Sequence, residues 1–318
     1  MSKTKSPKEV YRKKMKQKTL LFRIVDWLYL AIAALPLLCG IVLNILTKPP
    51  SEGISIAGAR IFFTVPMPLQ DLPVTEAQVN SFLVIISIFG LCLYITHGLT
   101  VKAETKRQHF AEWVVEKTEA MVQDSMGDFF KGYAPFIAAV LALSAFSSLL
   151  TLFGLYPPTS DMNGVAGWAI LVFILITYYK MKSGFLNYLK GFTKPIFVML
   201  PLNIISEIAT PVSMAFRHYG NVLSGSVIAV LIAYSLQALS SLLLGWLPGF
   251  LGQIPFLQIG LPAVLSLYFD IFSGCMQAYI FAMLTMLNIS GGFPQEEYEK
   301  RKQEKLEKKN KKKLKSNT

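Results

Sequence analysis

The chain has 318 residues, a length that fits one to three soluble domains or about six membrane-spanning helices with their loops. Hydrophobic residues make up 53% and charged residues only 16%, whereas soluble proteins carry about 25% charged residues. The mean hydropathy is +0.46. These values exclude a disordered chain, a coiled coil and an ordinary soluble enzyme, and they indicate an all-α polytopic integral membrane protein.

Basic residues are concentrated at the two ends of the chain. Residues 1–23 contain nine Lys or Arg and one Glu, and residues 296–318 contain ten Lys or Arg and five Glu. A nucleic-acid site would need its basic groups on a folded face with aromatic side chains nearby. Solvated basic tails instead lie against anionic lipid headgroups. We therefore expect membrane lipid, and no nucleic acid, to be the partner of the tails.

Six apolar stretches are each long enough to cross about 30 Å of hydrocarbon. They cover residues 24–46, 79–99, 133–156, 164–179, 196–246 and 263–289. The first stretch is longer than the apolar part of a signal peptide and lacks a cleavage site, so a retained helix is expected. The fifth contains Pro201, Pro211 and Gly220. It must tilt strongly, bend or form two helices, so the last two spans are expected to make a long tilted hairpin.

Two segments between the spans carry structure of their own. The polar loop 47–78 is rich in Pro and Gly, and residues 53–65 within it are typical of a short hairpin. Residues 101–136 combine apolar positions at helical spacing with many charges. This pattern predicts an amphipathic helix lying on the membrane surface, with a soluble linker helix as the alternative.

Cysteine and histidine give no sign of a metal site or a cofactor. Cys39, Cys92 and Cys275 lie in apolar runs without paired spacing, so they are expected to be small buried hydrophobic side chains. His97 and His109 fall near the predicted inner membrane interface and are interpreted as interfacial side chains.

The distribution of Lys and Arg predicts the orientation. Six spans bring both basic tails to the same side, and the outer loops then contain only Lys48 and Arg60. Both termini are therefore expected in the cytoplasm. The predicted units are a basic tail (1–23), an extra N-terminal span (24–46), an external loop (47–78), a membrane channel domain (79–292) and a second basic tail (293–318).

Four ionisable residues fall inside the last four spans, namely Glu207, Arg217, His218 and Asp270. A charge at mid-membrane costs several kcal/mol, with estimates from about 2.5 to over 10. Their presence favours an ion or proton path, or a counter-charge for one. A structural ion pair between the last two spans is the alternative.

Helical spacing groups these residues into polar stripes. One stripe of small and polar residues surrounds the cation: Ser213, Arg217, Gly220, Asn221 and Ser224. Glu207 and His218 share a second face and lie about 16 Å apart along the helix. The last span carries a third stripe: Asp270, Ser273, Gly274 and Gln277. An Arg stays protonated when desolvated, so it suits a permanent cation in a membrane.

Two segments carry a resemblance to a known family. Residues 201–225 contain Pro211, Ser213, Arg217, Gly220, Asn221 and Gly225 at the spacing of a signature, and residues 277–285 read QAYIFAMLT. Together they resemble subunit a of F-type ATP synthases. The resemblance covers about residues 80–290. It implies a membrane channel subunit of the bacterial inner, or plasma, membrane.

The resemblance implies a stator channel that works against a ring of c subunits, beside subunit b and the other subunits. The chain would translocate ions, with the proton favoured, and would not itself be an enzyme. Arg217 would face the ring carboxylates, and Gln277 would lie near it. Asp270, Asn221 and Gln277 would line the outer access path, and Glu207 with His218 would line or border the inner path.

The chain departs from the pattern at two positions. His218 stands where relatives have Leu, and Ser226 stands where they often have Glu or His. Asp270 is therefore expected to act alone as the outer exchangeable group. The sequence leaves open whether Ser226 lines the channel and whether the ion is H⁺ or Na⁺. A proton-coupled secondary transporter is the alternative function, although no internal repeat supports it.

Overall fold

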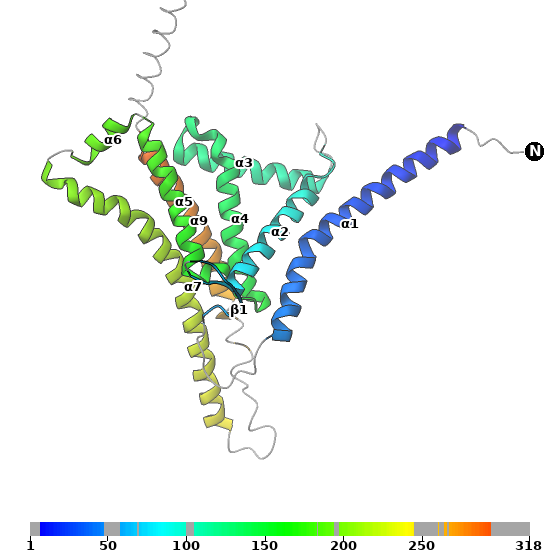
Figure 1. Ribbon diagram of the computed structural model, residues 1–318. Helices are drawn as coiled ribbons and strands as arrows, with labels where there is room; N and C mark the ends of the chain where they lie inside the picture. The colour runs from blue at the N-terminus through cyan, green and yellow to red at the C-terminus, as the bar shows by residue number, and fades with distance from the viewer. Residues whose placement is uncertain are drawn as a thin grey trace, which may run out of the picture.

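The computed structural model describes residues 7–47, 58–68, 70–99, 105–182, 184–193, 197–244, 260, 264–265 and 267–293. Six helices in this part of the chain are long and apolar enough to cross a membrane, as predicted. They contain α1 (Pro7–Thr47), α2 (Glu76–Thr96), α4 (Ala134–Leu149), α5 (Met162–Met181), α7 (Leu200–Leu244) and α9 (Gly274–Gly291). In Figure 1, α1 and α7 lean outward on opposite sides of the central helices.

The first helix packs against α2 through its C-terminal half and diverges from it toward the N-terminus (Figure 1). Gly90 of α2 allows the close approach, because a Cβ atom there would lie 2.6 Å from the backbone nitrogen of Ala33. The helix begins at Pro7. Part of the predicted basic tail 1–23 is therefore helical and continuous with the first span.

A polar cluster joins α1 and α2 to α3 (Lys106–Met126). One carboxylate oxygen of Asp26 accepts a hydrogen bond from Arg107 and lies 2.9 Å from Nδ1 of His97. Arg107 also donates to the carbonyl oxygen of His97 at 2.7 Å. Phe22 stacks on the His97 ring. His97 thus contacts residues of α1 and α3 at the end of α2. The sequence predicted only an interfacial side chain, because these partners come from distant segments of the chain.

The loop between α1 and α2 contains an antiparallel hairpin, but its register differs from the prediction. Strand β1 (Ile61–Val65) pairs with β2 (Leu72–Thr75), so the turn falls after residue 65. The prediction placed both strands within 53–65, of which residues 53–57 lie outside the described residues. Pro66 and Pro68 follow β1 directly and favour the turn at this point.

The predicted surface helix is α3, which starts at the side-chain cap Thr105 and stops at Gly127, where φ is +82°. It is not among the helices long and apolar enough to span, and it lies across the ends of α2 and α4 in Figure 1. Its buried face joins the main hydrophobic core. That core is formed mainly by α3, α4, α5 and α9, with Met214 from α7.

Within the long apolar stretch 196–246, residues Leu200–Leu244 form one continuous helix, α7, rather than two. Its 45 residues extend about 67 Å, roughly twice the hydrocarbon thickness. The helix contains Pro211 and curves along its length in Figure 1, and an internal proline is a usual cause of bending. Residues 180–195 fall between the predicted spans 164–179 and 196–246 and were expected to be a loop, but they contain a short helix, α6 (Phe185–Phe192).

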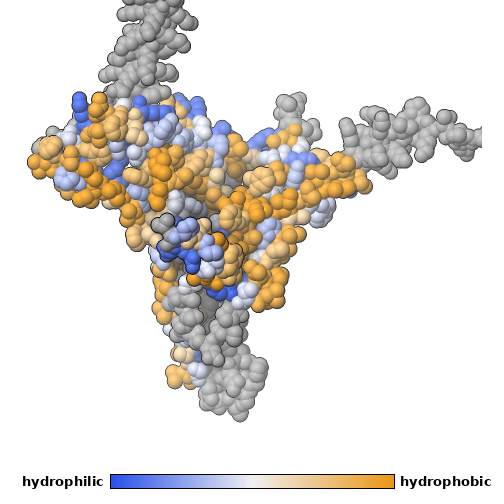
Figure 2. All heavy atoms as spheres, viewed as in Figure 1, coloured by the Kyte–Doolittle hydropathy of each residue, from blue (hydrophilic) through white to orange (hydrophobic). Residues whose placement is uncertain are grey.

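Apolar residues cover much of the described surface (Figure 2), as expected for helices that face lipid. The prediction that the cysteines are buried is wrong, because Cys39, Cys92 and Cys275 are all exposed and free. An apolar run indicates burial in a soluble core, but in a membrane protein the lipid-facing side of a helix is equally apolar. The pattern therefore could not distinguish the two positions.

Candidate functional site

Two cavities of about 220 Å³ each, both with polar side chains in their lining, lie along α7 on either side of Arg217. We name them the Asp270 cavity and the Glu207 cavity after their carboxylates. Arg217 is ten residues from Glu207 and nine from Ser226, which lines the other cavity. At 1.5 Å per residue these separations are about 15 and 14 Å along the helix.

The Asp270 cavity is formed by α7, the start of the last span and the turn after α4. Its polar lining comes from Ser148, Thr151, Tyr156, Ser160, Asn221, Ser226 and Asp270. Among the described residues no ion pair involves Asp270. The cavity therefore combines one carboxylate with hydroxyl and amide groups, which can hydrogen-bond water or a hydrated ion.

Asp270 lies in a π-helical segment, Leu267–Ser273, that precedes α9. Such segments are rare and occur frequently at functional sites. The following residue, Gly274, packs against α4, and a Cβ atom there would lie 2.6 Å from Cβ of Ser148. The wider winding changes which side chains share a face, so the stripe predicted from regular α-helical spacing does not hold along its full length.

Asn221 connects the last two spans beside this cavity. Its Nδ2 donates to Oγ of Ser273 at 3.0 Å, and that hydroxyl lies 3.2 Å from Oδ1 of Asn221. Ser226 also lines the cavity, and its hydroxyl donates to the carbonyl oxygen of Leu223. Asn221, which was expected on the outer path, and Ser226, whose place the sequence left open, thus line the same cavity as Asp270.

Tyr156 contributes a phenol to the cavity wall just outside the spans. Its hydroxyl donates to the carbonyl oxygen of Ser160 at 3.1 Å. Burial raises the pKa of Tyr156, and nearby acidic groups, including Asp161, raise it further. The phenol therefore stays protonated and neutral at physiological pH.

The Glu207 cavity holds an ion pair. Nζ of Lys180, near the end of α5, lies 2.5 Å from Oε2 of Glu207. The other carboxylate oxygen is buried and has no hydrogen-bond partner among the described residues. Polar lining also comes from Ser206, Thr210 and Asn288. The sequence reading missed Lys180 because it was assigned to the loop after α5, and its contact with α7 follows only from the packing of these helices.

Tyr188 of α6 lies close to the same carboxylate. Burial raises the pKa of Tyr188, and the negative charge of Glu207 raises it further. A short segment expected to be an irregular loop therefore brings a neutral hydroxyl group toward the Glu207 cavity.

Arg217 is an exposed residue of α7 within the fifth membrane span. No ion pair or hydrogen bond joins it to another residue in the described ranges. Its exposed neighbours include apolar side chains, with Val212 at 46% and Phe216 at 59% exposure, and also Ser213 one turn before it. A guanidinium group facing hydrocarbon is costly, so this face requires a polar or anionic partner.

His218 is fully buried next to Arg217, about 100° further round the helix axis. Its Nε2 lies 3.4 Å from Oγ of Ser144, and Trp168 and Phe281 pack edge-on against its ring. It lines neither cavity. His218 meets Trp168 and Glu207 meets Lys180, and both partners belong to α5, so the two residues lie on the side of α7 that packs against α5.

Gln277 is buried in α9, with 4% of its surface exposed. It is not among the residues that line either cavity. The structure therefore brings Asp270, Asn221 and Ser226 together and puts Gln277 in the adjoining helix packing, one to two turns from Asp270.

Comparison with known proteins assigns the family. The profile of the family described as ATP synthase A chain matches residues 79–290, well over half of the chain. ATP synthase subunit a 1 of Crocosphaera subtropica is 30% identical over 67% of this chain and 85% of its own length. The protein of Propionigenium modestum named ATP synthase subunit a, sodium ion specific, is 26% identical over 76% and 88%.

A third relative, ATP synthase subunit a of Legionella pneumophila, is 28% identical over 70% of this chain and 87% of its own length. These matches do not favour a secondary transporter. Six apolar helices and two polar cavities flanking a lone cation fit a multi-pass ion-translocating protein. The chain belongs to the ATP synthase A chain family, and it translocates ions as the subunit a of an ATP synthase Fo sector.

Proposed function

We propose that the chain is the non-catalytic stator channel of its complex, working against a ring of c subunits and held beside subunit b. The observation that carries this proposal is that Arg217 is exposed within a membrane span and makes no ion pair in the described ranges. A permanent cation in that position requires a negative group on a partner. Ring carboxylates that pass this face would supply the negative charge.

The orientation follows from the basic tails. We place both termini in the cytoplasm and the protein in a bacterial plasma membrane. The Asp270 cavity, at the end of the molecule that carries the hairpin, then opens outward. The Glu207 cavity, at the end that carries α6, opens to the cytoplasm. In this plan residues 79–292 form the channel domain and 24–46 form the additional span.

Each cavity would serve as half of the ion path. Asp270 would exchange ions with the outer medium, with Asn221 and Ser226 as polar lining. Glu207 would line the inner half. Because the two cavities lie on either side of Arg217, the guanidinium would prevent ions from passing directly between them, so that transfer requires the ring.

His218 and Gln277 would support the path from within the helix packing. Each is buried in the span that carries Arg217 or in the span beside it. His218 would border the inner half of the path, and Gln277 would help to orient α9 near the cation.

The test replaces Arg217 in the whole complex. Arg217→Ala should abolish ion-coupled ATP synthesis in vesicles while the complex still copurifies with a small ring protein that bears a carboxylate. Arg217→Lys should also fail or nearly so, because a desolvated Lys can lose its charge. Arg23→Ala removes an exposed guanidinium from α1 and is the matched control. Wild-type synthesis in assembled Arg217→Ala would contradict the proposal, and measurement with and without sodium identifies the ion.

The orientation has a separate test. A single cysteine in either tail should resist an impermeant thiol reagent in intact cells, whereas one in the 47–78 loop should react. The three native cysteines are exposed and are replaced first. Labelling of the N-terminal tail from outside would contradict the assigned topology.

A further inference from the structure

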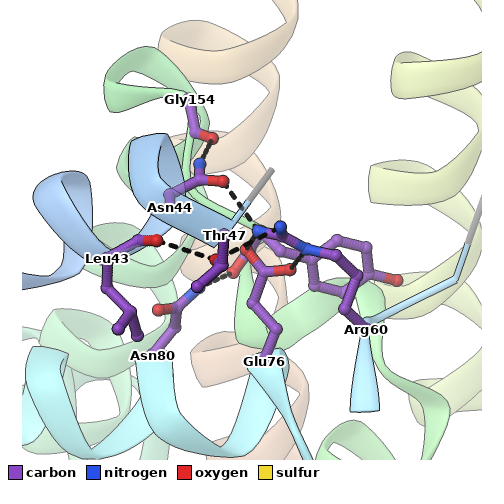
Figure 3. Close-up of polar contacts among 8 residues, drawn as sticks. Leu43, Asn44, Thr47, Arg60, Glu76, Asn80 and Gly154 are labelled. Carbon is purple, nitrogen blue, oxygen red and sulfur yellow. Dashed lines mark hydrogen bonds and ion pairs between the residues drawn. The ribbon is translucent and has the colours of Figure 1, made fainter. Parts of the chain in front are cut away.

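A second polar cluster lies beside the Asp270 cavity, where the first helix meets the hairpin (Figure 3). We name it the Arg60 cluster, after a guanidinium that forms two hydrogen bonds with one carboxylate. Nε of Arg60 donates to Oε2 of Glu76 at 2.7 Å, and Nη2 donates to Oε1 at 3.0 Å. The Glu76 side chain is only 7% exposed. The carboxylate raises the pKa of Arg60, so the guanidinium stays charged.

The same guanidinium also reaches the first helix. Nη2 of Arg60 donates to Oδ1 of Asn44 at 2.7 Å, and Nη1 contacts Oγ1 of Thr47 at 3.4 Å. The amide of Asn44 is therefore held by its oxygen. Its Nδ2 then donates to the carbonyl oxygen of Gly154 at 2.6 Å. Figure 3 shows this relay running from Arg60 through Asn44 to the turn after α4.

A second hydrogen bond fixes the same turn two residues later. Asn80 lies one turn after Glu76 in α2 and is 3% exposed. Its Nδ2 donates to the carbonyl oxygen of Tyr156 at 2.8 Å. Gly154 adopts φ +71°, a conformation that favours glycine, so the turn depends on a specific backbone shape. Two buried or part-buried amides thus hold two carbonyl groups of one short loop.

This loop is a wall of the Asp270 cavity. Tyr156, Pro157 and Ser160 line the cavity together with Asp270. The contacts therefore run without interruption from Arg60 to the cavity wall. Residues 44, 47, 60 and 76 all precede the region 79–290 that the family profile matches. The family assignment consequently gives no function to this cluster.

We propose that the Arg60 cluster positions the wall of the Asp270 cavity and thereby makes the first helix a working part of the outer ion path. The proposal rests on the function proposed above for that cavity. Arg60 acts here as a positioning residue, since its own contacts are with Glu76 and α1 rather than with the ion path. Displacement of the two held carbonyl groups would change the shape of the cavity while Asp270 itself remains intact.

The experiment measures ATP-driven ion pumping by the whole complex in vesicles. Arg60→Gln should reduce the pumping rate several-fold, because Glu76 is left buried without its counter-charge and the loop loses its anchor. Asn44→Ala removes the hydrogen bonds to Gly154 and to Arg60 but keeps the ion pair between Arg60 and Glu76, so it remains informative if Arg60→Gln fails to assemble. Arg60→Lys keeps the charge but not the paired geometry and should recover part of the rate. Arg23→Gln is the matched control.

A cavity-specific readout separates positioning from general stability. In a background without the three native cysteines, Ser160→Cys reports the Asp270 cavity and Ser206→Cys reports the Glu207 cavity. Arg60→Gln and Asn44→Ala should each change the thiol-labelling rate of Ser160→Cys several-fold. They should leave the labelling of Ser206→Cys unchanged, whereas a loosened protein would change both.

Pumping and labelling equal to those of Arg23→Gln in both variants would overturn the proposal. Pumping by Asp270→Asn is measured in the same vesicles, so that failure of the positioning inference can be distinguished from failure of the proposed outer path. If Asp270→Asn stops pumping while Arg60→Gln and Asn44→Ala pump normally, only the positioning inference fails. If Asp270→Asn pumps normally, the outer path proposed for the Asp270 cavity is itself wrong.

Discussion

The two cavities along α7 differ in how their carboxylates are balanced. Asp270 has hydroxyl and amide neighbours and no ion pair within the described ranges, whereas Glu207 is paired with Lys180 at 2.5 Å. An unpaired carboxylate can gain or lose a cation without breaking a salt bridge. A paired carboxylate must first part from its ammonium partner. The difference predicts that exchange occurs at the Asp270 cavity with less rearrangement than at the Glu207 cavity.

The strongest test of this difference between the two cavities is to remove the unpaired carboxylate. Asp270→Asn should lower ATP-driven pumping by about a hundredfold, the lower range for a positioned proton-exchanging group. Assembly should persist, because Asp270 makes no ion pair in the described structure. Asp270→Glu should retain part of the rate. Pumping is measured in vesicles, and the rate is divided by the amount of Fo sector, which is determined by immunoblot.

A carboxylate introduced at position 226 tests whether the lost ion flux can be restored. Ser226 lines the same cavity as Asp270, so Ser226→Glu combined with Asp270→Asn should restore part of the flux. If Asp270→Asn alone pumps normally, Asp270 is a structural group. If only the restoration fails, the exchangeable role of Asp270 stands, but a carboxylate at position 226 cannot replace it.

The second prediction concerns the paired cavity. Glu207→Gln and Lys180→Gln each leave one charge without its partner in a part-buried site. Each should lower stability by about 1–3 kcal/mol, less than for a fully buried pair, because 29% of the Lys180 side chain is exposed. The double variant should be more stable than the sum of the single effects predicts, with a coupling of about 0.5–3 kcal/mol. The stability of each variant is measured as the temperature at which the detergent-solubilised complex dissociates.

A surface pair supplies the control for this cycle. Lys131 pairs with Asp128 at 3.0 Å, but the two side chains are 59% and 75% exposed. Lys131→Gln should therefore leave the dissociation temperature unchanged. Additive effects of Glu207→Gln and Lys180→Gln would contradict a functional pairing in the Glu207 cavity.

Sequence periodicity predicted the spans because about 30 Å of hydrocarbon demands long apolar runs wherever a helix crosses it. It also identified Asp270 and Asn221, since a polar group in such a run is costly unless it is used. The exposure of Arg217 and the burial of His218 could not be obtained this way. Adjacent residues of one helix face different surroundings, and only packing against α4, α5 and α9 decides which side is covered.

Contacts between distant segments were equally hidden from the sequence. Lys180 meets Glu207 across 27 residues, and Asn44 meets Gly154 across 110. Both depend on how whole helices pack. The π-helical winding at Asp270 is another such feature, because no residue in 267–273 signals it. A regular helix was therefore the expected form, and its stripe included Gln277, which is buried away from the cavity lining.

The smallest expected effect on pumping comes from a glycine, and it tests whether close helix packing, rather than charge, shapes the Asp270 cavity. Alanine at a helical glycine usually stabilises by about 0.5–1 kcal/mol. Gly274→Ala should instead destabilise by about 1–3 kcal/mol, because its Cβ atom would lie 2.6 Å from Cβ of Ser148 and force the two helices apart. Pumping should fall modestly, and labelling of Ser160→Cys should change without a change at Ser206→Cys.

Two further variants make the cause of that effect explicit. Gly167→Ala in α5 has no atom within 4 Å of the added carbon, so it should be neutral or slightly stabilising. Adding Ser148→Gly to Gly274→Ala removes the two closest atoms and leaves the nearest backbone atom at 3.9 Å, so the cavity should regain its labelling rate. If Gly274→Ala behaves like Gly167→Ala, the helices adjust without cost. The difference between the two cavities would then lie in their charges alone.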